Sequence, residues 1–346
     1  KNLNKFGSIK IIRLPTFPRG NSNLSLILNY SSFLLSSIIF SLRFIIKSNF
    51  DKIIVFGTSP PSGLLVAHII RIFKRVPIYY WILDLWPETL LGLGISKKNF
   101  FYIILKKFME YSYKNCQYIF CQSRSIENLI RKKINNSKKT IYFPSWSEDL
   151  PFNKKKNINK LIDKKYFNIM FTGNVGEAQD FNSIVKAAKI LKKQNIKWII
   201  VGTGRFIKEL KVLISREKIE SNFIFLGSQE KKYINYIISF SDCLLITLKN
   251  TLIFSKTVPG KLSNYMISKK PIVGMISGDT KKIINLSKCG LCCNAGNYLK
   301  LSQNILILKK KSKKETIKLG KNGYKYAKKF FNREKLFQKF EKLLLN

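Results

Sequence analysis

The chain has 346 residues, of which 45% are hydrophobic and 24% are charged. This balance excludes an intrinsically disordered chain, and the length predicts about two domains of roughly 150 residues each. Lysine and arginine together number 63 against 19 acidic residues, which gives a formal net charge of +44. Such a charge favours an anionic partner, such as nucleic acid, anionic lipid or a polyanionic substrate. The abundance of Lys, Asn and Ile also fits the compositional bias of an AT-rich genome.

Residues 24–46 form the most hydrophobic window, LSLILNYSSFLLSSIIFSLRFII. The window is long enough for a membrane span, but Ser, Asn, Tyr and Arg43 interrupt it and its apolar residues favour one face. We therefore expect a buried or membrane-surface helix in preference to a spanning one. The sequence starts at Lys1 without a methionine or a targeting segment, and we expect its natural N-terminus to lie further upstream.

Short apolar runs alternate with helical periodicity from Asp51 onward. Strands are expected at 51–57, 77–84 and 116–122, with helices between them, the last of these over about 99–114. Such units predict a right-handed parallel sheet. The segment 143–160 then breaks the pattern with prolines and charges, which is typical of an interdomain linker.

A second alternating series follows the linker. Its expected strands are 167–171, 197–202, 223–227, 242–248, 271–276 and the short run GLCC, and Lys-rich helices close the chain. The predicted fold class is therefore α/β, with two tandem doubly wound, Rossmann-like parallel-sheet domains. We place them at 1–150 and 160–325, followed by a C-terminal helix at 326–346. Ligand sites are expected at the carboxyl ends of the strands, facing the cleft between the domains.

Two glycine turns follow strands of the second domain. In FTGNVGEAQDF, Gly173 and Gly176 flank Asn174 and permit a tight turn with exposed N–H groups ahead of a helix N-terminus. That arrangement suits a phosphate, although it lacks the spacing of a dinucleotide fingerprint. In VGTGRFIKEL, Gly204 ends a strand and Arg205 stands before a helix, where it would neutralise a diphosphate or simply face solvent.

The most distinctive stretch is TVPGKLSNYMISKKPIVGMISGDTKKII, residues 257–284. A Pro-Gly turn leads into a helix near Lys261, and the turn SGD starts another helix at Asp279. Two helix N-termini and one lysine therefore converge at one edge of the sheet. This convergence suits a nucleotide diphosphate.

The stretch WILDLWPETL, residues 81–90, ends a strand with two carboxylates. In a structural interpretation, Asp84 caps the turn, Pro87 starts a helix and Glu88 complements the helix dipole. In a functional interpretation, Asp84 contacts an acceptor hydroxyl from the carboxyl end of a strand. Trp86 would then pack on a sugar or a lipid carrier, with Glu88 in support.

The motifs DLWPE and P-x-K-L-x-x-Y-M-x-x-x-K-P-I-x-G-x-x-x-G-D resemble those of the retaining glycosyltransferases of the GT-B fold, family four. The likeness is greatest to the branch that builds bacterial surface polysaccharides, including O-antigen aminosugar transferases, and it spans nearly the whole chain. The chain departs from the family at four positions. Asn264 and Lys256 stand where family members carry glutamates, Gly260 replaces a serine, and Asp279 replaces a glutamate.

The resemblance implies that a hexose or an N-acetylaminosugar moves from a nucleotide sugar, expected to be a UDP-sugar, to a lipid-linked or oligosaccharide acceptor with retention of configuration. The product would be a surface glycan such as lipopolysaccharide. Neither a cofactor nor a metal is expected. The implied catalytic residues are Asp84, Glu88 and Lys261. The implied donor-binding residues are Gly173, Asn174, Gly176, Gly204, Arg205, Gly227, Lys261, Leu262 and Asp279.

The expected location is cytoplasmic, at the inner face of the bacterial plasma membrane, as a peripheral protein held by anionic lipid. Three other functions stay open: a catalytically degenerate homologue, a basic nucleic-acid-binding protein and a nucleotide-sugar epimerase. No legible nucleic-acid-binding motif supports the second. The one histidine, His68, lies in the apolar run LLVAHIIRIF and is expected to be structural, which disfavours the third. The six cysteines lack zinc spacing and are expected to be reduced thiols.

Overall fold

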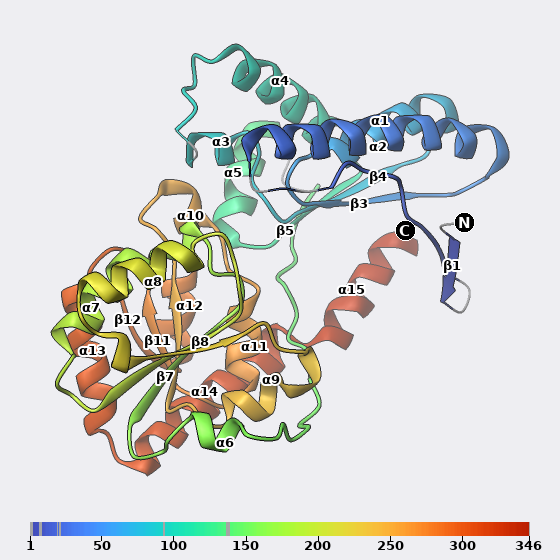
Figure 1. The fold of residues 1–346 in the computed structure, drawn as a ribbon. Coiled ribbons are helices and arrows are strands. Elements are labelled where there is room, and N and C mark those ends of the chain that lie inside the picture. Colours follow the sequence, from blue (N-terminus) through green and yellow to red (C-terminus); the bar gives the residue numbers. More distant parts are fainter. Residues whose placement is uncertain are drawn as a thin grey trace. The chain divides into compact units, whose positions relative to one another are not determined.

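The computed structural model describes residues 3–6, 9–18, 20, 22–92, 94–135 and 139–345. The chain divides into two compact units, Lys1–Phe143 and Pro144–Asn346, which we call unit 1 and unit 2 (Figure 1). Each unit contains its own parallel sheet and its own apolar core. The predicted α/β class with two parallel-sheet domains is confirmed.

Unit 1 is built on a four-stranded parallel sheet with strand order β3-β4-β5-β6. These strands are β3 (Ile53–Gly57), β4 (Ile78–Ile82), β5 (Tyr118–Cys121) and β6 (Thr140–Tyr142). The helices are α1 (Asn23–Lys47), α2 (Ser62–Lys74), α3 (Glu88–Gly92), α4 (Phe100–Asn115) and α5 (Arg124–Ile134), and an antiparallel pair, β1 (Leu3–Phe6) and β2 (Ile9–Ile12), precedes them. Every residue of β4 is buried, as expected for an inner strand covered on both faces.

Unit 2 has a six-stranded sheet with strand order β12-β11-β10-β7-β8-β9. Its pairings are all parallel. The strands are β7 (Phe167–Thr172), β8 (Ile196–Val201), β9 (Phe223–Gly227), β10 (Cys243–Thr247), β11 (Ile272–Met275) and β12 (Gly290–Cys293).

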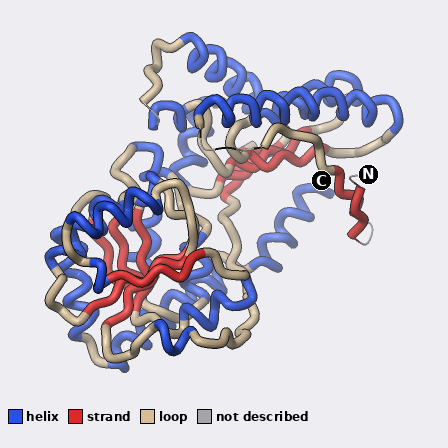
Figure 2. The backbone as a smooth tube through the Cα atoms, in the orientation of Figure 1, coloured by secondary structure: helices blue, strands red, loops and turns tan. Residues whose placement is uncertain are grey.

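Helices cover both faces of this sheet (Figure 2). The helices of unit 2 are α6 (Ile158–Leu161), α7 (Phe181–Ile190), α8 (Ile207–Arg216), α9 (Lys231–Ile238), α10 (Leu252–Lys256), α11 (Lys261–Ile267), α12 (Gly278–Ser287), α13 (Tyr298–Lys310), α14 (Lys313–Phe330) and α15 (Arg333–Leu345), with short 3₁₀ turns at Glu177–Gln179 and Glu220–Asn222. The last of them, α15, extends away from the sheet (Figure 1). Alternate strand residues enter opposite cores: Ile169 and Phe171 join one cluster, whereas Met170 joins the other. This alternation is the two-residue period of a strand.

The expected strands agree with the observed ones to within a few residues, but β6 was not predicted, because three residues are too short for a legible pattern. Residues 144–160, suggested as a linker, belong to unit 2. Ser147 N donates to Phe331 O at 2.8 Å there. The expected single helix at 326–346 is instead the end of α14 and all of α15. The helix is interrupted because Phe331 is buried and the Asn332 side chain caps α15 by accepting from Lys335 N at 2.9 Å.

Helix α1 occupies the predicted hydrophobic window and packs against α2 (Figure 1). Its inner face carries small buried residues such as Ser37 and Ser41. Its outer face exposes large apolar side chains, among them Leu35 and Ile39 at 60% and 65%. Across the described ranges, no helix combines the length and apolar character that a membrane span requires.

Candidate functional site

The two glycine turns of unit 2 lie side by side at the carboxyl ends of β7 and β8. Val175 N donates to Thr203 O at 2.9 Å across the gap. A Cβ atom at Gly202 would lie 2.0 Å from Gly173 O, and one at Gly204 would lie 2.2 Å from Val175 O. Both positions therefore need glycine because the two backbones touch. The turns form one continuous surface, which we call the double turn (residues 173–176 and 202–205).

Asn174 joins the two halves of the double turn. Its Oδ1 lies 2.7 Å from the position that a Cβ at Gly204 would take, and its Nδ2 lies 2.8 Å from that at Gly176. Gly176 N donates to Gln179 Oε1 at 3.2 Å. The structure thus brings together four of the predicted residues, Gly173, Asn174, Gly176 and Gly204, and Gly173 and Asn174 stay exposed.

Lys261, the first residue of α11, reaches the same place. Its Nζ lies 3.7 Å from the centroid of the Phe171 ring and 3.3 Å from where a Cβ at Gly173 would stand. The Nζ atom is buried and has no hydrogen-bond partner among the described residues. Burial lowers the pKa of Lys261 to about 7, because the charged amine is removed from water without a counter-charge. Because the Lys261 amine is buried and unpaired, it can form an ion pair with an anion that binds at the carboxyl end of β7.

Tyr265 holds helix α11, which carries Lys261, next to the end of β7. Tyr265 was not among the residues predicted for the site. It lies one helical turn after Lys261, and its hydroxyl accepts from Thr172 N at 2.8 Å. Burial raises the pKa of Tyr265 to about 12, so the hydroxyl stays protonated. The motif P-x-K-L-x-x-Y could have identified Tyr265, because residues four apart, such as Lys261 and Tyr265, share one face of a helix.

The other predicted donor-binding residues vary in placement. Arg205 is exposed just before α8, at the edge of the double turn. Gly227 ends β9 with φ of +64°, a conformation that favours glycine. Leu262 is fully buried in the core, and its N–H donates to Pro259 O, so neither group faces an open surface. Asp279 is only 6% exposed in the first turn of α12.

Asn264 and Ser263 hold the start of unit 2 in place. The Asn264 Oδ1 accepts from Glu148 N at 2.9 Å. The Ser263 hydroxyl donates to Trp146 O at 3.0 Å. The Asn264 side chain is therefore committed to a backbone contact. Helix α11 thus contacts segment 146–148 and also carries Lys261 as its first residue.

Asp84 of unit 1 belongs to a second polar cluster. It follows β4, and its Oδ2 accepts from Ser59 Oγ at 2.6 Å. Trp86 Nε1 donates to the same Ser59 Oγ at 3.2 Å. Ser59 comes from the turn after β3, the neighbouring strand. The pairing of Ser59 with Asp84 was not predicted, because the sequence pattern shows only that both follow neighbouring strands.

The suggestion that Trp86 packs on a sugar or a lipid carrier is wrong. Its side chain is 8% exposed and belongs to the core of unit 1, together with Leu85 and Leu90. Its carbonyl accepts from the Tyr113 hydroxyl at 3.1 Å. The ring serves the fold, and only its indole N–H reaches the polar cluster.

Glu88 starts α3, as expected for a carboxylate at a helix N-terminus. Its Oε1 lies 2.5 Å from Lys133 Nζ of α5, and both side chains are mostly buried. Its Oε2 is buried without a hydrogen-bond partner within the described part of the chain. Glu88 is thus paired with a lysine through one oxygen, while its other oxygen is buried and unpaired.

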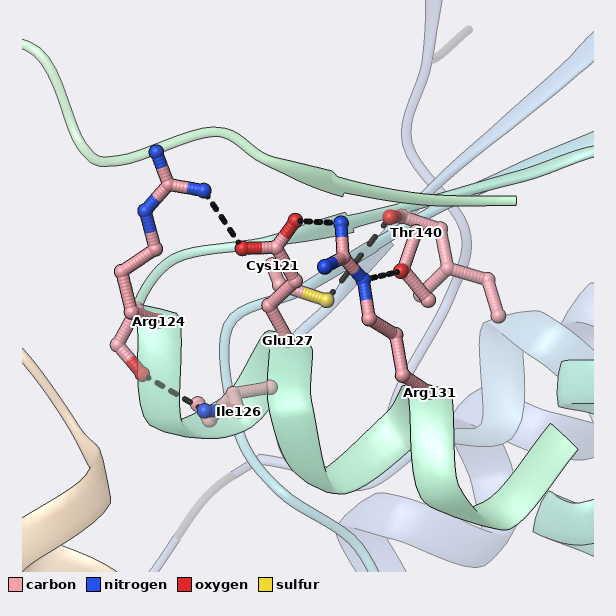
Figure 3. A network of polar contacts seen from close by, with 8 residues as sticks. Cys121, Arg124, Ile126, Glu127, Arg131 and Thr140 are labelled. Carbon is pink, nitrogen blue, oxygen red and sulfur yellow. Dashed lines mark hydrogen bonds and ion pairs between the residues drawn. The ribbon is translucent and has the colours of Figure 1, made fainter. Parts of the chain in front are cut away.

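A charged network lies at the carboxyl end of β5 (Figure 3). Glu127 of α5 is 2% exposed and pairs at 2.8 Å with both Arg124 and Arg131. Arg131 Nε also donates to Thr140 Oγ1 at 2.8 Å. The Arg124 guanidinium lies 4.1 Å from the centroid of the Tyr142 ring. Two arginines compensate the buried carboxylate, so the network ties α5 to β6.

The histidine and the cysteines lie outside these polar clusters. His68 is buried, and its Nε2 lies 3.0 Å from Ser112 Oγ. Burial, and then Arg71, lower the pKa of His68. Its burial and its contact with Ser112 agree with the expected structural role. All six cysteines are free thiols. No cluster of three or more His, Cys, Asp or Glu side chains suited to a metal ion occurs in the part of the chain that the structure describes.

Residues 152–329, just over half of the chain, match the family described as "Glycosyl transferases group 1". The "Probable glycosyltransferase WbjE" of Pseudomonas aeruginosa is 24% identical over 305 residues, which cover 84% of this chain and 74% of that protein. The "Putative colanic acid biosynthesis glycosyl transferase WcaI" of Escherichia coli (strain K12) is 26% identical over 275 residues, covering 75% and 66%.

Two solved structures share the fold. The sucrose-phosphate synthase of Thermosynechococcus elongatus aligns with a TM-score of 0.76 at 14% identity, covering 99% of this chain and 85% of that one. Anabaena HepE, crystallised with UDP, aligns with a TM-score of 0.71 at 14% identity, covering 94% and 84%. The fold is that of GT-B glycosyltransferases, and the chain belongs to the glycosyl transferases group 1 family.

Proposed function

We propose that unit 2 binds the diphosphate of a UDP-sugar at the double turn. The carrying observation is the buried Lys261 Nζ, which has no hydrogen-bond partner among the described residues and lies next to Gly173. Arg205 stands at the edge of the same surface. HepE, a structural neighbour, was crystallised with UDP and with UDP-glucose, which supports this class of donor.

In the proposed reaction, the bond between the sugar C1 and the phosphate oxygen breaks, and a bond from C1 to the acceptor oxygen forms on the same face. The leaving diphosphate takes the acceptor's proton, so configuration is retained and UDP is released. Lys261 and Arg205 stabilise the negative charge that develops on that diphosphate. In unit 1, Asp84 with Ser59 contacts the acceptor hydroxyl, and Glu88 supports the acceptor side. Neither a metal nor a cofactor takes part in this proposal.

The proposed acceptor is a lipid-linked glycan destined for a bacterial surface polysaccharide, such as the O-antigen of lipopolysaccharide. The name of the relative WcaI refers to colanic acid biosynthesis, which supports this class of product. The proposed location is peripheral, at the inner face of the plasma membrane. The net charge of +44 supports an affinity for anionic lipid.

Isothermal calorimetry with UDP, GDP and CDP, and with a DNA duplex at physiological salt, tests the donor assignment. We expect selective binding of UDP that is lost in Lys261→Ala and kept in Lys208→Ala, a matched control at an exposed lysine of α8. Unchanged UDP binding in Lys261→Ala contradicts the site. Steeply salt-dependent binding of DNA alone favours the nucleic-acid alternative.

A degenerate homologue is the second candidate, because Asn264 contacts the backbone of segment 146–148 and is not free to replace the family's glutamate. Release of UDP from UDP-sugars, measured with and without lipid-linked acceptor, separates the two. Donor turnover excludes the degenerate homologue, whereas UDP binding without any turnover supports it.

A further inference from the structure

Helix α4 turns large apolar side chains outward. Phe100 and Phe101 in its first turn are 77% and 58% exposed, and Ile104 is 49% exposed. The opposite face, with residues such as Tyr102 and Met109, is buried in unit 1. Phe100, Phe101 and Ile104 are neighbours on the helix surface and form a contiguous apolar surface. An exposed apolar surface with charged residues at its rim often marks an interaction site.

A basic cavity adjoins this surface. Its volume is about 440 Å³, and four lysines line it: Lys97, Lys106, Lys107 and Lys133. Lys133 pairs with Glu88, and Lys106 lies 3.9 Å from a carboxylate oxygen of Glu110. Within the described ranges, Lys97 and Lys107 have no ion pair, so the cavity carries two uncompensated positive charges. Ile103, 41% exposed, lines the cavity and lies beside the apolar residues of α4.

We propose that α4 is a membrane-docking surface: its phenylalanines and Ile104 enter an anionic bilayer while the cavity takes a phosphoryl headgroup of that bilayer. Interfacial helices combine an apolar face with basic residues in this way. The unpaired lysines complement the phosphates of an anionic bilayer, and the adjacent apolar side chains can enter its hydrocarbon layer. Nucleic acid supplies phosphate but no hydrocarbon layer.

The proposal names a surface other than the exposed face of α1. The 25 residues of α1 contain only Arg43 and Lys47 as charged residues. That helix therefore lacks the lysine cluster which accompanies α4. Lipid binding by α4 does not depend on the donor site of unit 2. A variant can therefore lose lipid binding while it keeps UDP binding, or lose UDP binding while it keeps lipid binding.

Vesicle flotation of the full chain tests the surface. Vesicles of phosphatidylcholine with phosphatidylglycerol are compared with pure phosphatidylcholine, at low and high salt. We expect binding only to the anionic vesicles. Phe100→Ser with Phe101→Ser is expected to weaken binding at least about tenfold, and Lys97→Glu with Lys107→Glu at least about fivefold per lysine. The salt sensitivity should be smaller in the lysine variant.

Matched controls lie on unit 2. Val212→Ser with Leu286→Ser changes two exposed apolar residues, at 59% and 74%, on α8 and α12. Lys193→Glu with Lys208→Glu removes two exposed lysines. Both controls are expected to bind vesicles like the unchanged chain. All variants should keep their thermal midpoint and their affinity for UDP, since the altered side chains are exposed and the donor site is elsewhere.

Three results overturn the proposal. The first is equal loss of binding in the unit 2 lysine control, which reduces the effect to net charge. The second is loss of binding in Leu35→Ser with Ile39→Ser of α1 while both α4 variants still bind. The third is the absence of any binding to anionic vesicles.

Discussion

Replacing Lys261 with methionine should make the protein more stable near neutral pH while it removes UDP binding. Methionine has similar length and fits over the Phe171 ring without a charge to desolvate. The pKa of Lys261 is about 7 in the folded protein against an ordinary value of 10.5. Between those two values the unfolded chain binds more protons than the folded one, so the stability of the lysine protein rises with pH across this window.

The size of the effect follows from the pKa difference. One pKa unit corresponds to about 1.4 kcal/mol, so the cost of the charged amine is about 4 kcal/mol at pH 7 and about 2 kcal/mol at pH 9. The stability advantage of Lys261→Met should therefore shrink by about 2 kcal/mol between these pH values. Lys208→Met, at an exposed lysine, should show no such pH-dependent difference from the unchanged protein.

Urea unfolding at pH 7 and pH 9, monitored by tryptophan fluorescence and circular dichroism, measures the difference. A constant difference between Lys261→Met and the unchanged protein at both pH values would refute the reasoning, because it would mean that the amine is solvated in the folded state. If Lys261→Met loses UDP binding without becoming more stable, Lys261 binds the donor but its amine is not desolvated in the folded protein.

Two further predictions address packing. Gly204→Ala should lower UDP affinity at least about tenfold, since its Cβ would lie 2.2 Å from Val175 O and separate the halves of the double turn; calorimetry compares it with Gly63→Ala, whose Cβ meets its nearest atom at an ordinary 3.7 Å. Glu127→Gln should lower the unfolding free energy of unit 1 by about 2 kcal/mol, less than for a fully buried pair because its arginine partners are partly exposed. A thermal midpoint unchanged by Glu127→Gln would show that Arg131 does not depend on that carboxylate.

The sequence predicted those parts of the site that depend on local chain geometry. The glycine turns and the start of the Lys261 helix are visible as short patterns, and parallel topology brings the ends of neighbouring strands together. Contacts between distant residues were not legible. Tyr265 and Thr172 are 93 residues apart, and nothing in either local sequence pairs them. Trp86 was misread because an aromatic beside carboxylates suggests a ligand, whereas its burial depends on helices that follow it in the chain.

The contact between the halves of the double turn has a consequence for protein engineering. Neither glycine loop is an independent part, since each supplies the wall against which the other is shaped. Exchanging one loop with that of another transferase to alter donor preference would leave mismatched backbones. The unit of transplantation is therefore the pair, moved together with the strands that carry it, and random libraries confined to a single loop would be rich in unfolded members.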